Sequence, residues 1–432
     1  MAIREQSLRE NWQTHVEPQR ETRLKVAYVM SRFPKLTETF ILYEMLAVEQ
    51  QGVQVELYPL LRGRHPFMHP EAALWVRRAH YVPFVSRQIL RAHLRFLRRT
   101  PRAYLGALWS LLRGTWGSFR FFTGALGIFP KVVYFADHMA AEGIQHVHAH
   151  FASHPAAAAF VIHRLTGIPY SFTAHGSDLH RDRHMLREKV AEAAFVVTVS
   201  DYNKQLINEE CGAQFRDKIV VIHCGADLQI FQPGAASRPE AQSPHPFTIL
   251  CIGTLHEVKG QTYLIEACRL LNERGIDFLC QFVGDGPDHN RLTRQIAQAG
   301  LNERIQLLGQ RTRDQIAGLL TQAHAVATPS VSTTSGRREG ILVALMEAMA
   351  SGVPVVASDL SGIPELVEHE RSGLLVPPRN TRALADALDR LYRDSALRQR
   401  LGQAGREKVL REFNLHSNAR TLAQLFRPED RP

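Results

Sequence analysis

The chain has 432 residues, of which 45% are hydrophobic, and it carries a formal net charge of +10. This length favours two or three domains with sizeable cores. No run of 18 apolar residues occurs, which excludes a membrane-spanning helix, and the polar stretch 1–22 lacks the apolar segment of a signal peptide. The five cysteines lie too far apart for metal-ligand spacing and are typical of the reduced core thiols of a cytosolic protein.

The positive charge is concentrated in one segment. Residues 72–136 contain no Asp or Glu but eleven Arg or Lys, so the rest of the chain is nearly neutral. Arginines recur every three or four residues over 87–99, and Trp and Phe residues follow at 109–129. This pattern favours helices at 86–131 that lie on an anionic membrane surface through the basic residues of 77–131. A solvated helix face is one alternative. Nucleic acid is the other, and without a nucleic-acid-binding module we expect no such partner.

The N-terminal half alternates between predicted strands and helices. After an expected disordered tail at 1–22, we predict a buried strand at 24–30, a loop at 31–39, a helix at 40–51 and a strand at 53–60. This order begins a parallel, doubly wound sheet, in which ligands bind beyond the carboxyl ends of the strands. The first loop lacks a G-x-G-x-x-G sequence, so we expect no dinucleotide there.

Histidines mark the next two predicted strands. His146, His148 and His150 alternate along one strand, so their side chains share one face. No acid or cysteine is spaced to complete a metal site with them, and we predict no metal. A strand at 170–174 runs into His175, at the edge where such sheets bind ligands. His175 is a candidate hydrogen-bond donor to a phosphate or sugar oxygen, and the alternative is a core histidine satisfied by the backbone.

A second cycle of strands and helices follows a linker at 233–246 that is rich in Pro, Gly, Ala and Ser. We predict strands at 247–252, 278–283, 305–308, 325–328 and 353–357, and helices at 262–274, 292–299, 313–322 and 380–411. The chain is therefore expected to form two doubly wound α/β domains, 23–232 and 247–411, and a last helix within 412–432 that returns to the first domain.

The segment 337–354 is the most informative stretch. Residues 341–350 are apolar nearly all round and predict a buried helix, entered through Gly340, where the backbone can approach a ligand. The free N–H groups of a helix N-terminus suit a phosphate. Glu339 and Glu347 are separated by about 12 Å of helix, so their carboxylates could hold the two polyol ends of a sugar nucleotide. The alternative is a surface acid and a salt-bridged core acid.

Together these motifs resemble the retaining glycosyltransferases of family four, which have the GT-B fold. The motifs are the E-x7-E pair Glu339 and Glu347, GIPELVEHERSGLLVPPRN at 362–380, the loop 253–259 and VGDGP at 283–287. In the first domain, SRFPKLTETFI at 31–41, HAHF at 148–151 and TAHGSD at 173–178 are similar to the colanic-acid type of exopolysaccharide transferase. The resemblance covers about residues 24–427. It implies an acceptor-side domain and a nucleotide-sugar-binding domain that face each other across a cleft.

The resemblance also implies roles for individual residues. Glu339 is expected to bind hydroxyls of the donor sugar, and Lys259 is expected to neutralise the diphosphate as its charge grows. His175 is expected to contact the donor sugar or phosphate from the facing domain. Glu347 is expected to bind the ribose hydroxyls. The further residues expected to contact the nucleotide sugar are Gly253, Thr254, Gly284, Gly286, Arg311, Gly340, Ile341 and Leu342.

The implied activity is hexosyl transfer from a nucleoside-diphosphate sugar to a hydroxyl of a lipid-linked or polysaccharide acceptor, with retained stereochemistry. No D-x-D element precedes the site, so no metal or other cofactor is expected.

The family usually has Arg directly after Gly253. This chain has Thr254, so Arg337 or Arg338 must supply the missing cation or donor binding is weaker. A cytoplasmic protein, peripheral on the inner face of the plasma membrane, is expected. The alternatives are a sugar-nucleotide epimerase of the same fold and a non-catalytic nucleotide-sugar-binding paralogue.

Overall fold

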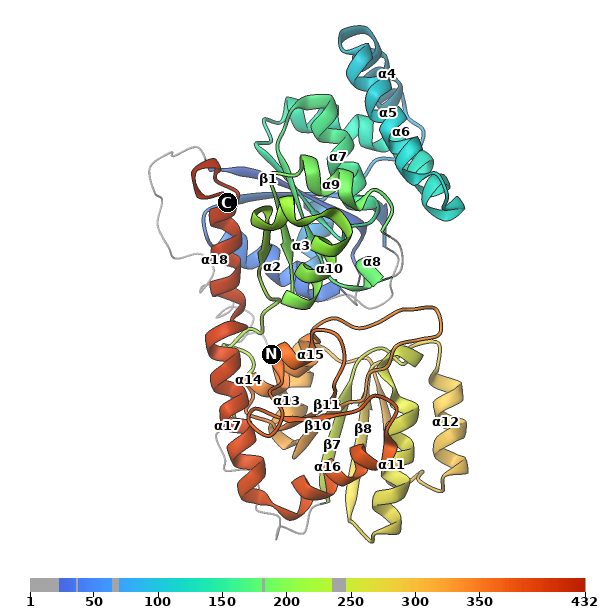
Figure 1. Ribbon diagram of the computed structural model, residues 1–432, viewed down its shortest axis with the longest axis vertical. Coiled ribbons are helices and arrows are strands. Elements are labelled where there is room, and N and C mark those ends of the chain that lie inside the picture. Colours follow the sequence, from blue (N-terminus) through green and yellow to red (C-terminus); the bar gives the residue numbers. More distant parts are fainter. Residues whose placement is uncertain (1–22, 36–37, 64–69, 181–182, 235–245, 432) are drawn as a thin grey trace, which may run out of the picture.

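The computed structural model describes residues 23–35, 38–63, 70–180, 183–234 and 246–431. The expected tail at 1–22 and most of the expected linker at 233–246 lie outside these residues. Two α/β domains stack along the long axis of the molecule, and each is built on a six-stranded sheet (Figure 1). Every strand pair within the two sheets is parallel, which confirms the predicted pair of doubly wound domains.

The elements of the N-terminal domain follow the predicted alternation, with a helical insertion between its second and third strands. They are β1 Lys25–Phe33, α2 Thr39–Glu49, β2 Gln54–Arg62, α3 Pro70–Arg78, α4 Arg87–Arg99, α5 Pro101–Thr115, α6 Phe119–Ala141, β3 His146–His150, α7 His154–Thr166, β4 Tyr170–Ala174, α8 Ser177–His180, α9 Leu186–Glu192, β5 Phe195–Thr198, α10 Asp201–Cys211 and β6 Ile219–Val221.

The C-terminal domain repeats the alternation more regularly. Its elements are β7 Phe247–Ile252, α11 Gln261–Glu273, β8 Phe278–Val283, α12 His289–Gln298, β9 Ile305–Gly309, α13 Arg313–Gln322, β10 Ala325–Thr328, α14 Val343–Ala350, β11 Val355–Ser358, α15 Ile363–Leu366, β12 Leu374–Val376, α16 Thr381–Arg393 and α17 Ser395–Glu412. The single helix predicted at 380–411 is wrong, because two helices occupy this stretch. The break lies at Asp394, whose side chain accepts a hydrogen bond from the Leu397 amide and caps α17.

The strand orders determine where ligands can bind. The second sheet has the order β12-β11-β10-β7-β8-β9, and the first has the order β2-β1-β3-β4-β5-β6. In each sheet the order of connection reverses between two neighbouring strands, which are β7 and β10 in the second sheet and β1 and β3 in the first. A doubly wound sheet has a crevice at this switch point, beyond the carboxyl ends of the two strands. The loops after β1, β3, β7 and β10 are therefore the natural binding loops.

The last helix of the chain, α18 Leu415–Leu425, belongs to the N-terminal domain. It packs against α2 on one face of the first sheet, and Figure 1 shows α17 and α18 running along one side of both domains. Alternate residues of β1 point to opposite faces, so that Tyr28 joins the core with α2 and α18, whereas Val29 joins the core with α6 and α7.

The two domains also meet through a carboxylate that caps a helix. Glu365 of α15 accepts hydrogen bonds from the backbone N–H groups of Asp201 and Tyr202, each at 2.8 Å. These amides are the unpaired donors of the first turn of α10, where the helix dipole favours a negative charge. The contact joins the C-terminal domain directly to the N-terminal domain.

The basic segment begins within α3, and most of it forms α4, α5 and α6, on the side of the N-terminal domain away from the C-terminal domain (Figure 1). Not all of its cations face solution. Lys131 is buried and donates a hydrogen bond to the Leu60 carbonyl at 2.7 Å, and burial lowers the pKa of its ammonium. Arg78 pairs with Glu49. None of the helices in the described part of the chain is long and apolar enough to cross a bilayer.

Candidate active site

A pocket of about 300 Å³ lies between the domains, at the switch points of both sheets. It is lined from the N-terminal domain by Lys35, Glu38, Thr39, Phe40, Phe151, His175, Ser177, Val199 and Cys224, and from the C-terminal domain by Ile252, Gly253, Thr254, His256, Val258, Lys259 and 337–344. The residues that follow β1, β3, β4, β7 and β10 are therefore brought together, as the strand orders require.

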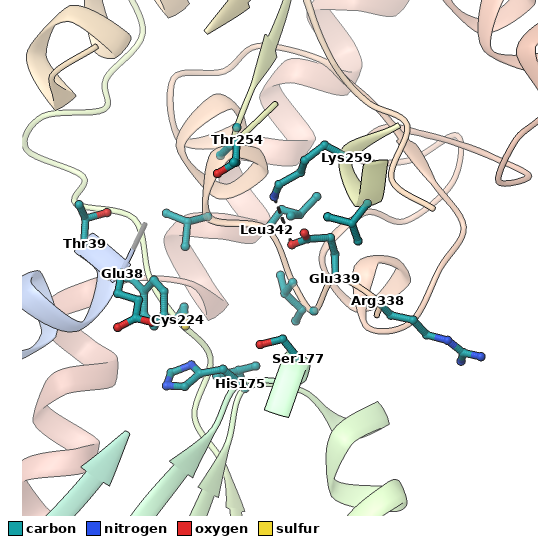
Figure 2. Close-up of a pocket in the computed structure, with 18 of the residues that line it drawn as sticks. Glu38, Thr39, His175, Ser177, Cys224, Thr254, Lys259, Arg338, Glu339 and Leu342 are labelled. Atoms are coloured by element: carbon teal, nitrogen blue, oxygen red, sulfur yellow. Dashed lines mark ion pairs between the residues drawn. The ribbon is translucent and has the colours of Figure 1, made fainter. Parts of the chain in front are cut away.

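Lys259 and Glu339 meet in this pocket. Lys259 ends a single 3-10 turn after β7, and Glu339 lies in the loop that leads from β10 to α14. The Nζ atom of Lys259 is 3.1 Å from Oε2 of Glu339, and Figure 2 shows the two side chains pointing toward each other. Both side chains are about one-fifth exposed, so a bound ligand can reach a cation and a carboxylate side by side.

The N-terminus of α14 opens onto the same pocket. The helix begins at Val343, with Leu342 as its N-cap residue, and no side chain in the described part of the chain caps it. The predicted start at Ile341 is therefore two residues early, because Leu342 has an extended backbone that the apolar pattern could not reveal. Within the described residues, the N–H groups of Val343 and Ala344 have no backbone acceptor. Both residues line the pocket, where free N–H groups favour an anion.

Gly340 allows the two domains to approach closely. A Cβ atom on this residue would lie only 2.8 Å from the carbonyl oxygen of His175, closer than side-chain carbons pack. The glycine before α14 therefore has a packing role against the facing domain. It also places the backbone of the Glu339 loop next to His175.

His175 follows β4 and lines the pocket from the N-terminal domain. Its ring packs against those of Phe40 and Phe151, each with a centroid distance of 4.8 Å, and its Nε2 lies 3.1 Å from Nδ1 of His150. Its backbone N–H donates to the carboxylate of Asp178. Burial, and secondarily the neighbouring His150, lower the pKa of His175 well below its usual range. The imidazole is therefore neutral at physiological pH.

Glu347 lies outside this pocket. It projects from α14 and is half-buried, and burial raises the pKa of its carboxyl group to about 7, although Arg313 acts in the opposite direction. Nη1 of Arg313 lies 3.3 Å from Oδ2 of Asp227, and the guanidinium carbon of Arg313 lies 3.9 Å from the ring centroid of Tyr43. The two glutamates of the E-x7-E pair thus occupy different environments.

Three further residues expected at the nucleotide do not line the pocket either. A Cβ atom on Gly284 would lie 2.1 Å from the Gly253 carbonyl oxygen, and one on Gly286 would lie 2.4 Å from the Leu255 carbonyl oxygen. These glycines let the loop after β8 pack directly on the loop after β7. Arg311 donates a hydrogen bond to the carbonyl of the preceding residue.

Sequence reasoning pointed to the loop after β1 but not to its individual side chains. Lys35 and Glu38 line the pocket and pair with each other through Oε1 of Glu38. Glu38 is only 7% exposed, and its Oε2 has no hydrogen-bond partner in the part of the chain that the structure describes. A buried carboxylate oxygen without a partner is costly, so this atom is a candidate ligand contact. The switch-point rule, applied residue by residue to the loop, could have found it.

Arg337 and Arg338, the two arginines expected to supply a cation in place of Thr254, both line the pocket. The guanidinium of Arg338 points away from Lys259 and Glu339 (Figure 2), and it donates to the Tyr202 hydroxyl at 3.2 Å. Of the two arginines, Arg337 therefore remains the better candidate to supply a second cation.

Comparison with known proteins matches both halves of the chain to glycosyltransferases. The family model for glycosyl transferases group 1 matches residues 235–408, and the model for glycosyltransferase family 4 matches residues 111–230. The chain is 31% identical to the putative colanic acid biosynthesis glycosyltransferase WcaL of Escherichia coli (strain K12), over 93% of this chain and 99% of that protein. It is 36% identical to the amylovoran biosynthesis glycosyltransferase AmsK of Erwinia amylovora, over 58% of this chain and 62% of that protein.

Solved structures share the fold at lower sequence identity. A glycosyltransferase from Rickettsia africae superposes with a TM-score of 0.69 at 19% identity, covering 94% of this chain and 98% of that one. HepE from Anabaena, in complex with UDP-glucose, superposes with a TM-score of 0.68 at 17% identity. The match covers 93% of this chain and 98% of HepE. The two facing doubly wound domains are thus the GT-B fold, and the chain belongs to the family 4 glycosyltransferases.

Proposed function

We propose that this enzyme moves a sugar, with retained stereochemistry, from a nucleoside-diphosphate sugar to a hydroxyl of a glycan or lipid-linked acceptor in exopolysaccharide synthesis. The observation that carries the proposal is the convergence of Lys259, Glu339 and the free N–H groups of α14 in one pocket, opposite His175. The relatives named for colanic acid and amylovoran biosynthesis support the pathway. The HepE complex with UDP-glucose supports the donor class.

In the proposed mechanism the diphosphate lies at the N-terminus of α14 and replaces Glu339 as the partner of Lys259. Glu339, released from Lys259, accepts hydrogen bonds from hydroxyls of the donor sugar. As the glycosidic bond breaks with oxocarbenium character, negative charge grows on the leaving diphosphate, where Lys259 and the free N–H groups stabilise it. The acceptor hydroxyl then attacks from the side that the diphosphate leaves, and its proton passes to the departing diphosphate oxygen. No carboxylate is assigned as a nucleophile, so the double-displacement scheme of retaining glycosidases does not apply.

The wall formed by the N-terminal domain is proposed to hold the acceptor. Lys35, Glu38 and Thr39 line the pocket opposite the α14 terminus. Oε2 of Glu38, which has no hydrogen-bond partner among the described residues, can accept a hydrogen bond from an acceptor hydroxyl and orient it toward the sugar carbon. Closure of the two domains around donor and acceptor would exclude water from the reaction.

The donor is identified first by thermal shift over a set of nucleoside-diphosphate sugars, because a ligand of the native state raises the melting temperature. Transfer with that labelled donor is then followed in extracts of exopolysaccharide precursors, and NMR gives the anomeric configuration of the product. A product with inverted configuration would contradict the retaining mechanism. A new sugar nucleotide formed without any acceptor would instead identify an epimerase, and donor binding without turnover would identify a binding paralogue.

The reaction is proposed to need no metal ion, because protein groups can neutralise the diphosphate. Lys259, the α14 terminus and Arg337 supply the positive charge that a divalent cation supplies elsewhere. We therefore expect EDTA at millimolar concentration to change the transfer rate by less than about twofold. Transfer that stops in EDTA and returns with Mn²⁺ would contradict this expectation.

Docking on an anionic membrane surface is proposed for α4, α5 and the start of α6. Leu90, Leu94 and Leu97 are exposed along α4, next to a row of exposed arginines. Three aromatic side chains on α5 and at its junction with α6 are also largely exposed, Trp109 by 65%, Trp116 by 77% and Phe119 by 86%. Apolar and aromatic side chains flanked by arginines are typical of helices in the membrane interface. This surface would bring a lipid-linked acceptor to the enzyme, on the inner face of the plasma membrane.

Changing Arg91, Arg98 and Arg99 to Gln is expected to weaken binding to vesicles that contain anionic lipid by about 10²-fold. Each arginine near such a surface contributes about 1 kcal/mol. These three are exposed and have no ion pair within the described residues, whereas the neighbouring Arg95 pairs with Asp137. Sedimentation with vesicles at physiological salt measures the effect.

A matched control carries the same charge change on the exposed Arg294, Arg382 and Arg420, which lie on α12, α16 and α18. It should bind vesicles like the unaltered protein. If both triple variants lost vesicle binding equally, the net charge of the protein alone would explain the effect. That result would contradict docking through α4.

A further inference from the structure

Behind the pocket, a chain of close polar contacts connects α2 to His175. Nδ1 of His150 lies 3.1 Å from Nε2 of His175, and Nε2 of His150 lies 3.2 Å from Oε1 of Glu44. The Tyr28 hydroxyl donates to the same Glu44 oxygen at 3.4 Å. The His150 side chain is fully buried, and its ring stacks on that of His175 with an interplanar angle of 20°. The contacts therefore form one connected path from a carboxylate to a pocket residue.

The order of these groups sets the position of each proton. Nε2 of His150 makes no hydrogen bond among the described residues, but it lies 3.2 Å from a carboxylate oxygen of Glu44, where a lone pair on Nε2 would face the lone pairs of that oxygen. With the one ring proton of His150 placed on Nε2, Nδ1 is an acceptor, and Nε2 of His175 carries the proton between the two rings. His175, being neutral, therefore keeps a lone pair on Nδ1. In the described part of the chain, Nδ1 has no hydrogen-bond partner and remains available to a ligand.

We propose that Glu44 and His150 are positioning residues that hold His175 in the Nε2–H tautomer, so that its Nδ1 accepts a hydrogen bond from a hydroxyl of the donor sugar. The inference rests on the proposed function. It gives His175 an acceptor role toward the sugar in place of a donor role toward phosphate. Diphosphate binding is then left to Lys259 and the α14 terminus.

A buried metal ion is the competing explanation of this cluster, because atoms of Glu44, His148 and His150 lie within 4.8 Å of one another. Hydrogen bonding favours the relay. Both ring nitrogens of His148 already have partners, with Nδ1 at 2.8 Å from the Ser171 hydroxyl and Nε2 at 3.0 Å from the Thr173 hydroxyl. A metal bound by His148 would have to displace one of these hydrogen bonds.

The test compares His150→Leu with His150→Asn. Leucine removes the acceptor for the His175 proton, whereas Oδ1 of asparagine can take the place of Nδ1. We expect His150→Leu to lower kcat/KM for the donor about 10–100-fold, the range typical of residues that orient a functional histidine. His150→Asn should recover most of this loss, and His163→Gln, in the last turn of α7 and outside the pocket lining, should act like the unaltered protein. The affinity for the nucleoside diphosphate alone, tested with UDP and GDP, should change by less than about twofold in all three variants.

Nitrogen-15 NMR of histidine-labelled, ligand-free protein reads the tautomer without any turnover. His175 should show an unprotonated Nδ1, and this signal should change in His150→Leu and Glu44→Leu. A protonated Nδ1, unchanged transfer in His150→Leu, or one zinc ion per chain in the purified protein would each overturn the relay. Failure of the unaltered enzyme to transfer any sugar would instead overturn the proposed function, and the NMR result would still decide the tautomer.

Discussion

Replacing Glu339 with alanine is expected to lower kcat/KM for sugar transfer about 10²–10⁴-fold. In the proposed complex this carboxylate accepts hydrogen bonds from two donor hydroxyls. Hydrogen bonds to a charged group contribute about 1.5–3 kcal/mol each, and 1.4 kcal/mol corresponds to a factor of ten. The measurement is steady-state transfer of a labelled sugar at several donor concentrations.

The fold should tolerate this change. Glu339 lies in a loop, and its ion pair with Lys259 is partly open to solvent, where such pairs contribute about 1 kcal/mol or less to the free energy of unfolding. Glu257→Ala is a matched control, since Glu257 is exposed in the same turn as Lys259 and does not line the pocket. It should transfer sugar normally. Near-normal transfer by Glu339→Ala would contradict the proposed role of Glu339 in binding the donor sugar.

Replacing Lys259 with methionine is expected to lower kcat about 10²–10³-fold, the usual effect of removing one preorganised group that stabilises developing charge. Methionine keeps much of the side-chain length and removes the ammonium. Lys259→Arg keeps the charge with a different geometry, so it should recover part of the rate. Single-turnover measurements with the donor identified by thermal shift would separate this chemical step from product release.

The two residues should not act independently. Lys259 and Glu339 contact each other at 3.1 Å in the ligand-free protein, and in the proposed complex the diphosphate takes the place of Glu339 beside Lys259. Each single variant therefore no longer has to break this ion pair, and the double variant should lose more activity than the product of the two single losses, by about fivefold or less for a partly exposed pair. Strictly multiplicative losses would show that the ion pair is not exchanged for the diphosphate.

The fold was predictable to a large extent because its signals are local. Buried strands such as 247–252 and 325–328 are short apolar runs between turn residues, and the structure has β7 and β10 with these same bounds. The start of α14 was not predictable, because Ile341 and Leu342 are apolar and yet precede the helix, with an extended backbone at Leu342. Periodicity alone does not distinguish the first helical residue from an apolar N-cap residue.

The surroundings of the site depended on contacts between distant parts of the chain. The alternation of His146, His148 and His150 predicted a shared face, but Glu44 reaches His150 from a helix that lies far away in the sequence. The charge pattern likewise could not show that Lys131 is buried against a backbone carbonyl. Tertiary packing, rather than residue type, determines which charged side chains are exposed to solvent and which carboxylate contacts which histidine.

The position of α18 affects how the protein is made. Leu415, Ala419 and Leu422 complete the core beside α2, and the Phe426 ring lies 5.3 Å from the rings of His146 and His148. The core of the second domain extends only to Phe413, just after α17, whereas the first domain must wait for α18 to leave the ribosome. Folding during synthesis would therefore finish in the reverse of the coding order. A nonsense mutation before residue 415 would damage the domain that was translated first.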